Sequence, residues 1–343
     1  MRYPEFLKPG GRIGFIAPSF GCAEEPYKTR FDEMLKLFRG MGYKSVLGPN
    51  CFCGCGIGKS NTAENCAAEI NDFFLNDRSD IILSCGGGET MCEDLSLVDF
   101  EGIKNSKPKW FMGFSDNTNL TFTLPVLCDT AAIYGPNATA FGMNPWHESL
   151  SDALMAICGT GFSLCNYNGW ERPAPETEDE DPLATYDINE PFRITYGGSA
   201  TVKAEFSGRL IGGCLDCLSV LCGTKFDRVT DFAERYKEDG IIWVMEACDL
   251  NPMGIRRALW QLDNAGWFRY VRGFLIGRAL HYDDDIMGMN RINAVTGILD
   301  KYNVPILMDL DIGHLPPMMP LVMGSVAEVK ALRNELTIDQ RLE

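Results

Sequence analysis

The first half of the chain alternates short apolar runs with segments of helical periodicity, and this alternation restricts the fold more than any other feature. Apolar runs that fit buried strands occupy residues 11–19, 80–85 and 110–114. Residues 27–41 and 61–76 repeat apolar side chains at helical spacing, the latter after a cap-like Asn-Thr-Ala-Glu. Strands that alternate with helices form a parallel sheet covered by helices on both faces. The sequence therefore predicts an α/β fold.

The second half repeats this alternation after an interruption. Residues 166–195 are rich in proline and acidic side chains, which is typical of a loop or an interdomain linker. Strand-like runs then return, and residues 251–265 read as a helix with a proline in its first turn. We expect three parts: an N-terminal α/β domain (residues 1–165), a linker or active-site loop (166–200) and a C-terminal β/α domain (201–343).

Composition excludes several classes of partner. The 343 residues carry a net charge of −16, which disfavours binding to a nucleic-acid polymer or to an anionic membrane surface. The apolar runs are strand-length rather than membrane-spanning, and the first residues lack the apolar core of a signal peptide. We therefore expect a cytoplasmic protein with no membrane contact.

The 14 cysteines raise the question of disulfides or metal. Most stand in apolar or glycine-rich contexts, where reduced cysteines act as small hydrophobic residues. The densest stretch, Cys51-Phe52-Cys53-Gly54-Cys55, matches no zinc spacing and has no histidine nearby in the sequence. We expect no bound metal, and a cysteine-based redox or metal protein is the weakest of the functional hypotheses.

Chemistry is first suggested at residues 110–119, where an aromatic run leads through a glycine into a serine and several helix-capping residues. This pattern predicts a buried strand that turns sharply into a helix, with Ser115 at the corner. A serine there is placed to act as a nucleophile, because the helix N-terminus behind it favours negative charge on a reacting oxygen. Serine is also an ordinary N-cap residue, so a purely structural role stays open.

Three histidines are available as a base for this serine. His147 lies in a polar Pro-Trp-His-Glu turn that fits the surface, and His281 precedes three aspartates. His314 stands between a glycine and two prolines, where a restrained backbone presents the side chain. Each histidine considered alone is more often structural than catalytic, although imidazole is the usual general base near neutral pH.

A carboxylate in the second half of the chain is a candidate partner for His314. Glu246 ends the apolar run 241–245, where an unpaired buried carboxylate would be costly. It either forms a salt bridge with Arg256 or Arg257, or orients an imidazole as the third member of a triad.

The order of these residues also matters. The order Ser115, Glu246, His314 is one that known triads use. The residues around Ser115 do not form a Gly-x-Ser-x-Gly elbow, which argues against a standard α/β-hydrolase.

Two glycine-containing motifs require interpretation. The Gly-Lys-Ser at residues 58–60 mimics the end of a phosphate-binding P-loop, but Cys53 occupies the required upstream glycine position. The three glycines at residues 86–88 lack the spacing of a dinucleotide fingerprint. Their amides are instead suited to donate hydrogen bonds to an oxyanion.

Taken together, short motifs along nearly the whole chain resemble one known family, the serine peptidases that include LD-carboxypeptidase and the microcin C immunity peptidase. No single motif is strong, and it is their order and spacing that are specific. The motifs are Leu7-Lys8-Pro9-Gly10, Pro18-Ser19, Gly86-Gly87, Gly113-Phe114-Ser115-Asp116, Tyr134-Gly135-Pro136, Ile211-Gly212-Gly213, the run from Trp243 to Glu246, and Gly313-His314 followed by Pro320.

The resemblance implies a fold and an assembly. The N-terminal domain would be flavodoxin-like and the C-terminal domain a β/α domain of swivelling-barrel type, with the site in the cleft between them. Members of the family are typically cytoplasmic homodimers. No metal and no cofactor are implied.

The resemblance also assigns roles to residues. It implies Ser115 as the nucleophile, His314 as the general base and Glu246 as the residue that orients it.

An oxyanion hole is implied as well. Its donors would be the backbone amides of Gly87 or Gly88 and of Asp116.

The chain departs from the family pattern at two places. Where the family commonly has Gly-Gly-Asn-Leu, this chain has Cys214, which removes any contact made by the asparagine side chain. The acidic loop after Trp170 resembles the immunity-peptidase branch, in which an aromatic loop residue helps to hold a nucleotide-bearing substrate. Trp170 is therefore a weak candidate for a substrate-stacking residue, against a role in loop packing.

Three functional hypotheses follow. The first is a serine carboxypeptidase that cleaves an amide near a carboxy terminus, with a murein peptide as substrate and a place in peptidoglycan recycling. The second is a peptidase of the microcin C immunity type, which acts on aminoacyl-nucleotide amides. The third is a two-domain protein that binds a small ligand without chemistry.

Overall fold

The computed structural model describes residues 1–56, 58–172 and 181–343. Within these ranges the chain forms two compact units. Of the described residues, unit 1 comprises 1–56, 58–161 and 181–186, and unit 2 comprises 162–172 and 187–343. The chain therefore passes from one unit to the other more than once.

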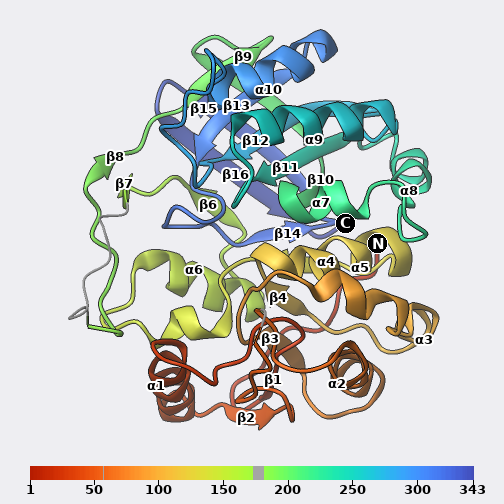
Figure 1. The fold of residues 1–343 in the computed structure, drawn as a ribbon, viewed down its shortest axis with the longest axis vertical. Helices are drawn as coiled ribbons and strands as arrows, with labels where there is room; N and C mark the ends of the chain where they lie inside the picture. The colour runs from red at the N-terminus through yellow and green to blue at the C-terminus, as the bar shows by residue number, and fades with distance from the viewer. Residues whose placement is uncertain (57, 173–180) are drawn as a thin grey trace. The chain divides into compact units, whose positions relative to one another are not determined.

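The parallel sheet of unit 1 has the strand order β5-β4-β3-β1-β2, which is the flavodoxin-like order 2-1-3-4-5. Helices α1 and α6 cover one face of this sheet, and α2 and α3 cover the other (Figure 1). This arrangement confirms the predicted α/β fold with helices on both faces. The elements of unit 1 are β1 (Arg12–Ile16), α1 (Tyr27–Gly40), β2 (Lys44–Leu47), α2 (Ala63–Leu75), β3 (Ile81–Ser84), η1 (Met91–Ser96), α3 (Phe100–Asn105), β4 (Phe111–Gly113), η2 (Ser115–Asn117), α4 (Thr118–Thr121), α5 (Thr123–Cys128), β5 (Ala132–Tyr134), η3 (Ala138–Gly142) and α6 (Glu148–Ile157).

The first two helices form where their periodicity predicts. Helix α1 buries Phe31, Met34 and Phe38 at helical spacing, and Phe31 meets Phe15 of β1 edge to face, with 5.6 Å between ring centroids. Helix α2 begins at the predicted cap, where the Thr62 side chain accepts a hydrogen bond from the Asn65 amide. Apolar burial thus fixes both helices against the sheet.

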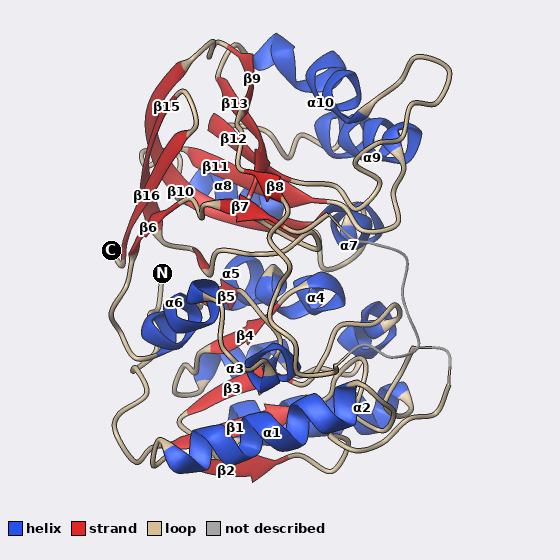
Figure 2. Cartoon of the chain, turned by 90° about the vertical axis from the view of Figure 1, so that its left-hand side faces the viewer, coloured by secondary structure: helices blue, strands red, loops and turns tan. Residues whose placement is uncertain are grey.

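The sheet of unit 2 is mixed. Strands β10, β11, β12 and β13 run parallel, β15 pairs antiparallel with β10, and β9 pairs antiparallel with β13. Helices α7, α9 and α10 lie on the same side of this sheet (Figure 2). The elements of unit 2 are β6 (Ser163–Cys165), β7 (Gly169–Trp170), β8 (Glu190–Pro191), β9 (Thr195–Gly198), β10 (Lys203–Cys214), α7 (Leu215–Leu221), α8 (Val229–Arg235), β11 (Ile241–Glu246), α9 (Pro252–Asn264), β12 (Val271–Gly277), α10 (Arg291–Leu299), η4 (Asp300–Tyr302), β13 (Pro305–Leu310), β14 (Leu321–Met323), β15 (Val326–Leu332) and β16 (Glu335–Arg341).

The β10–β13 region is the predicted β/α part of unit 2, since each parallel strand is joined to the next through a helix. Helix α9 starts as predicted, with Pro252 in its first turn and the Asn251 side chain accepting from the Gly254 amide. In parallel sheets the loops at the carboxyl ends of the strands carry the functional groups. In unit 1 these loops follow β1, β3 and β4, and in unit 2 they follow β11 and β13.

Candidate active site

Ser115 lies at the carboxyl end of β4 in an uncommon backbone conformation. Phe114 occupies the cap position, and Ser115 is the first residue of η2, with a φ of +64°. A residue other than glycine in this left-handed region costs on the order of 1–3 kcal/mol, and such strain concentrates at functional sites. The plain N-cap interpretation is therefore wrong, because the serine sits inside a sharp strand-to-helix turn.

Hydrogen bonds on both sides hold this turn. The Ser115 amide donates to the Tyr134 hydroxyl at 3.3 Å, and the Phe114 amide donates to Asn137 Oδ1 at 3.2 Å. Asn117 Nδ2 donates to the Gly86 carbonyl at 2.8 Å. The turn is thus tied directly to the glycine segment that follows β3.

That glycine segment passes close to the serine side chain. A Cβ atom placed on Gly87 would lie 3.2 Å from Ser115 Oγ, and one on Gly88, whose φ is +146°, would lie 2.1 Å from Ser19 Oγ. Position 88 therefore requires glycine, and a side chain at position 87 would be tightly packed against Ser115. Among the described residues, no hydrogen bond engages the amide N–H of Gly87 or Gly88, so both amides are available to a developing negative charge beside Ser115.

Unit 2 contains a buried carboxylate and imidazole in direct contact. Glu246, the last residue of β11, accepts a hydrogen bond at Oε2 from His314 Nδ1 at 2.7 Å, and its side chain is fully buried. The alternative partner Arg256 instead donates to the Asn293 carbonyl at 2.9 Å. Of the partners that the sequence offered, Glu246 therefore contacts His314, which is the pairing that a triad requires.

The hydrogen-bonded pair of Glu246 and His314, called the dyad below, changes the proton affinity of the imidazole. Burial alone lowers the pKa of His314, but the Glu246 carboxylate and the Cys248 thiol together hold it well above the usual imidazole range. Burial raises the pKa of Cys248, and its contact with His314 lowers it. The cation formed when His314 accepts a proton is therefore stabilised where it forms.

A carboxylate that the sequence did not single out orders the segment next to this dyad. Asp216, in the first turn of α7, accepts the backbone amides of Cys248, Asp249 and Leu250 at 3.0, 2.9 and 3.1 Å. These residues directly follow Glu246 and Ala247 in the chain. The only available signal was an acidic residue in the first turn of a helix, which is too common to identify a site.

Glu246 leaves no room for a side chain at position 313, so a glycine is needed there. Its φ is +97°, and a Cβ there would lie 2.4 Å from Glu246 Oε2. We expect Gly313→Ala to reduce turnover about 100-fold, because displacing a catalytic group by even 1 Å can cost that much. Turnover and the thermal midpoint are measured in parallel.

Gly266→Ala is the matched control for this change. Gly266 has a φ of +79°, but no atom lies within 4 Å of its missing Cβ. We expect it to lose about 1 kcal/mol of stability and to keep full turnover. Equal turnover in the two variants would show that the space beside Glu246 does not matter.

The other two histidines have local roles. His147 caps α6, where Nδ1 accepts from the Ser149 amide at 3.2 Å, and burial lowers its pKa. The exposed His281 pairs with Asp284 at 3.2 Å.

Trp170 is enclosed in unit 2. Its side chain is only 4% exposed, and it packs 5.0 Å from the Tyr282 ring, with the guanidinium groups of Arg172 and Arg278 at 5.1 and 5.2 Å from its own centroid. Little of its aromatic surface is left to stack on a ligand. The rest of the acidic loop, residues 173–180, lies outside the described residues.

The cysteine-rich stretch at residues 51–55 contains both buried and exposed thiols. Cys51 is buried while Cys55 is exposed, and both are free thiols. The described ranges contain no group of three histidine, cysteine or acidic side chains placed to hold a metal ion. In the same ranges, no helix has both the length and the apolar character needed to cross a bilayer.

Comparisons with known proteins place this geometry in a family. Residues 13–135 match the model of the LD-carboxypeptidase N-terminal domain, and residues 207–329 match that of its C-terminal domain. A Streptomyces coelicolor protein provisionally named a carboxypeptidase is 25% identical over 340 residues, which cover 98% of this chain and 96% of that one. The microcin C7 self-immunity protein MccF of Escherichia coli is 24% identical over 93% of this chain and 90% of its own length.

Solved structures agree at the level of fold. Wild-type MccF without ligand superposes with a TM-score of 0.81 at 21% identity, covering 100% of this chain and 99% of that one. An MccF-like protein from Bacillus anthracis gives 0.82 at 20% identity, covering 99% and 100%. With both family domains matched in order along one continuous polypeptide, the chain belongs to the LD-carboxypeptidase family of peptidases.

Proposed function

We propose that this protein is a serine peptidase that hydrolyses an amide near a carboxy terminus, with Ser115, His314 and Glu246 as its triad. The observation that carries the proposal is the buried hydrogen bond of 2.7 Å between Glu246 and His314. A buried carboxylate that fixes an imidazole is the orienting pair of a serine hydrolase. Ser115 would supply the nucleophile. The two glycine amides beside it, which make no hydrogen bond within the described residues, would stabilise the oxyanion.

The reaction follows from these groups. Because Glu246 holds Nδ1 of His314, the imidazole exchanges the reacting proton at Nε2. His314 takes the proton from Ser115 Oγ as the oxygen attacks the substrate carbonyl, and the cation it becomes is stabilised by Glu246.

The tetrahedral intermediate then collapses. Its oxyanion is stabilised by the amides of Gly87 or Gly88 and of Asp116. The leaving amine departs with the proton from His314. Water then gives a proton to His314 as it attacks the acyl-enzyme carbonyl, and Ser115 Oγ leaves and takes that proton back, which releases the carboxylic acid.

We propose a murein peptide that ends in a D-residue as the first substrate class. The matches to both LD-carboxypeptidase domains and the provisionally named carboxypeptidases support this choice. The second class is an aminoacyl-nucleotide amide, favoured by the near full-length similarity to MccF, whose solved complexes include adenosine monophosphate and aspartyl sulfamoyl adenosine. The cytoplasmic location and the homodimer, which we expect from the sequence, remain predictions.

A substrate panel distinguishes these classes. Murein tetrapeptide and aspartyl sulfamoyl adenosine are each incubated with the protein, and the product masses are recorded. Loss of the terminal D-residue identifies a carboxypeptidase, and release of free aspartate identifies the immunity-type reaction. A fluorophosphonate probe tests the ligand-binding alternative, because a protein without an activated serine is not labelled at Ser115.

A further inference from the structure

The Gly-Lys-Ser turn that is not a P-loop packs against the glycine segment beside Ser115. The Ser60 amide donates to the Ser19 carbonyl at 2.6 Å, and the Ser60 hydroxyl donates to the Ala17 carbonyl at 2.5 Å. The Gly58 carbonyl oxygen lies 2.7 Å from the position that a Cβ on Gly88 would occupy. The turn therefore supports both the end of β1 and the glycine segment that follows β3.

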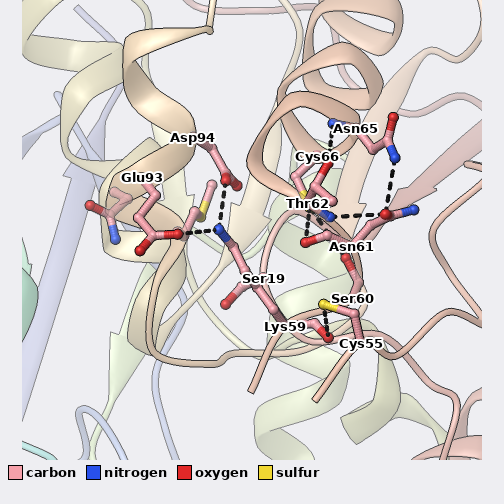
Figure 3. A network of polar contacts seen from close by, with 12 residues as sticks. Ser19, Cys55, Lys59, Ser60, Asn61, Thr62, Asn65, Cys66, Glu93 and Asp94 are labelled. Atoms are coloured by element: carbon pink, nitrogen blue, oxygen red, sulfur yellow. Dashed lines mark hydrogen bonds and ion pairs between the residues drawn. The ribbon is translucent and has the colours of Figure 1, made fainter. Parts of the chain in front are cut away.

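Its lysine is buried in an ionic cluster. The Lys59 side chain reaches between two acidic residues of η1 (Figure 3), with Nζ 2.9 Å from Glu93 Oε2 and 3.2 Å from Asp94 Oδ1. Lys59 is 4% exposed and Asp94 is fully buried. A buried carboxylate needs such a cation, since in the described part of the chain neither of its oxygens accepts a hydrogen bond.

The surroundings of Asp94 act on its charge in opposite directions. Burial, with smaller contributions from the nearby carboxylates of Asp116 and Glu93, raises the pKa of Asp94 to about 7 against the opposing effect of Lys59. Two buried carboxylates, Asp94 and Asp116, thus lie near each other, and the first of them contacts the buried Lys59 ammonium group. Without Lys59, the buried negative charge of Asp94 would be uncompensated. This charge would act on Asp116, the residue that follows Ser115.

The Asp116 carboxylate links this cluster to the turn that contains Ser115. Its Oδ2 accepts from the Ser19 hydroxyl at 2.5 Å and from the Met91 amide at 2.9 Å, and its Oδ1 accepts from Asn119 Nδ2 at 2.9 Å. Ser19 follows β1, Met91 starts η1 after the glycine segment, and Asp116 follows β4. One carboxylate therefore joins the ends of three strands around Ser115.

We propose that Ser19, Lys59 and Asp94 are positioning residues for the reaction at Ser115, which hold the glycine segment at the distance that an oxyanion requires. The inference rests on the proposed function. Oxyanion donors act only within about 2.7–3.1 Å of the developing charge, so a small shift of the segment is costly. Ser19 controls that distance directly, because its hydroxyl lies against Gly88 and binds Asp116.

The test uses the full-length protein and a fluorophosphonate probe, whose phosphonyl oxygen needs the same donors as an oxyanion. The rate of Ser115 labelling is measured against probe concentration. We expect Ser19→Ala to lower the limiting rate about tenfold or more, by the loss of one charge-assisted hydrogen bond, and to leave the half-saturating concentration unchanged. A residue that only stabilised the fold would move the thermal midpoint and leave the limiting rate of the folded protein unchanged.

A paired variant and a control complete the test. Lys59→Gln with Asp94→Asn removes both buried charges together, so no lone charge is left in the interior, and it should give a similar loss of limiting rate. Glu93→Gln is the control: Glu93 contacts the same ammonium group at 2.9 Å but reaches solvent, so labelling should stay within about twofold of wild type.

The outcomes separate this inference from the proposed function. Wild-type labelling with unchanged limiting rates in folded Ser19→Ala and in the paired variant would overturn the positioning roles alone. Absence of labelling at Ser115 in the wild type would overturn the serine-peptidase proposal and the positioning roles with it. If Ser19→Ala does not fold, the paired variant decides.

Discussion

Ser115→Ala should lose at least about 10³-fold in turnover of whichever panel substrate the wild-type protein cleaves, and should not react with a fluorophosphonate. The alanine keeps the backbone but removes the oxygen that forms the acyl-enzyme. The remaining activity would reflect only bound water and the amide donors. Steady-state turnover and the mass of the labelled protein measure the two effects.

Ser106→Ala is the control for this result. Its hydroxyl donates to the Ile103 carbonyl at 2.9 Å at the end of α3 and has no part in the proposed chemistry. It should label and turn over like the wild type. Cleavage by Ser115→Ala at more than about a tenth of the wild-type rate would exclude Ser115 as the nucleophile.

The second large effect is expected from Glu246→Gln, read through the pH dependence of kcat/KM. In the wild type, kcat/KM should rise with pH as the His314 cation loses its proton, with a midpoint above the usual imidazole value, because Glu246 raises the pKa of His314. Removing the carboxylate charge disfavours the cation, so the midpoint should shift to lower pH. Turnover should fall by about 10³- to 10⁴-fold, since glutamine no longer fixes the reactive tautomer.

His281→Gln is the control for the pH experiment, because His281 also pairs with a carboxylate but is exposed. Its profile should superimpose on that of the wild type. A midpoint that stays in place in Glu246→Gln would mean that a group other than His314 governs the profile.

Several strands and helices of both units were predictable because they depend on local apolar periodicity. Residues 27–41 and 251–265 bury one face each, and the corresponding helices begin and end within two residues of the predicted limits. The parallel sheet followed from the alternation of these elements. These features require only neighbours along the chain.

The conformation of Ser115 could not be predicted in the same way. The sequence around it fits a helix start, and only the structure shows a φ of +64°. That value is maintained by Tyr134, Asn137 and the Gly86 carbonyl, which are between 19 and 31 residues distant from their partners in the turn. The Pro18-Ser19 and Tyr134-Gly135-Pro136 motifs carried the family resemblance, but nothing local assigned Ser19 or Tyr134 a role.

The partner of Glu246 was open for a related reason. The sequence allowed either an arginine 10 or 11 residues away or a histidine 68 residues away. Burial of the strand end selects the histidine, and burial is a property of the folded unit. Trp170 illustrates the converse, since its aromatic character suggested a ligand while Arg172, Arg278 and Tyr282 cover its faces.

The division of the chain into units has a consequence for how such proteins exchange parts by recombination. Unit 1 includes residues of the 174–186 segment, where the Pro182 carbonyl accepts from Arg30 at 2.5 Å and the Leu183 carbonyl accepts from the Asn144 amide at 2.8 Å. The coding sequence of unit 1 is therefore split by that of residues 162–173. A single genetic crossover therefore cannot transfer either unit intact, and a hybrid protein would keep a unit whole only if both of its stretches came from the same parent.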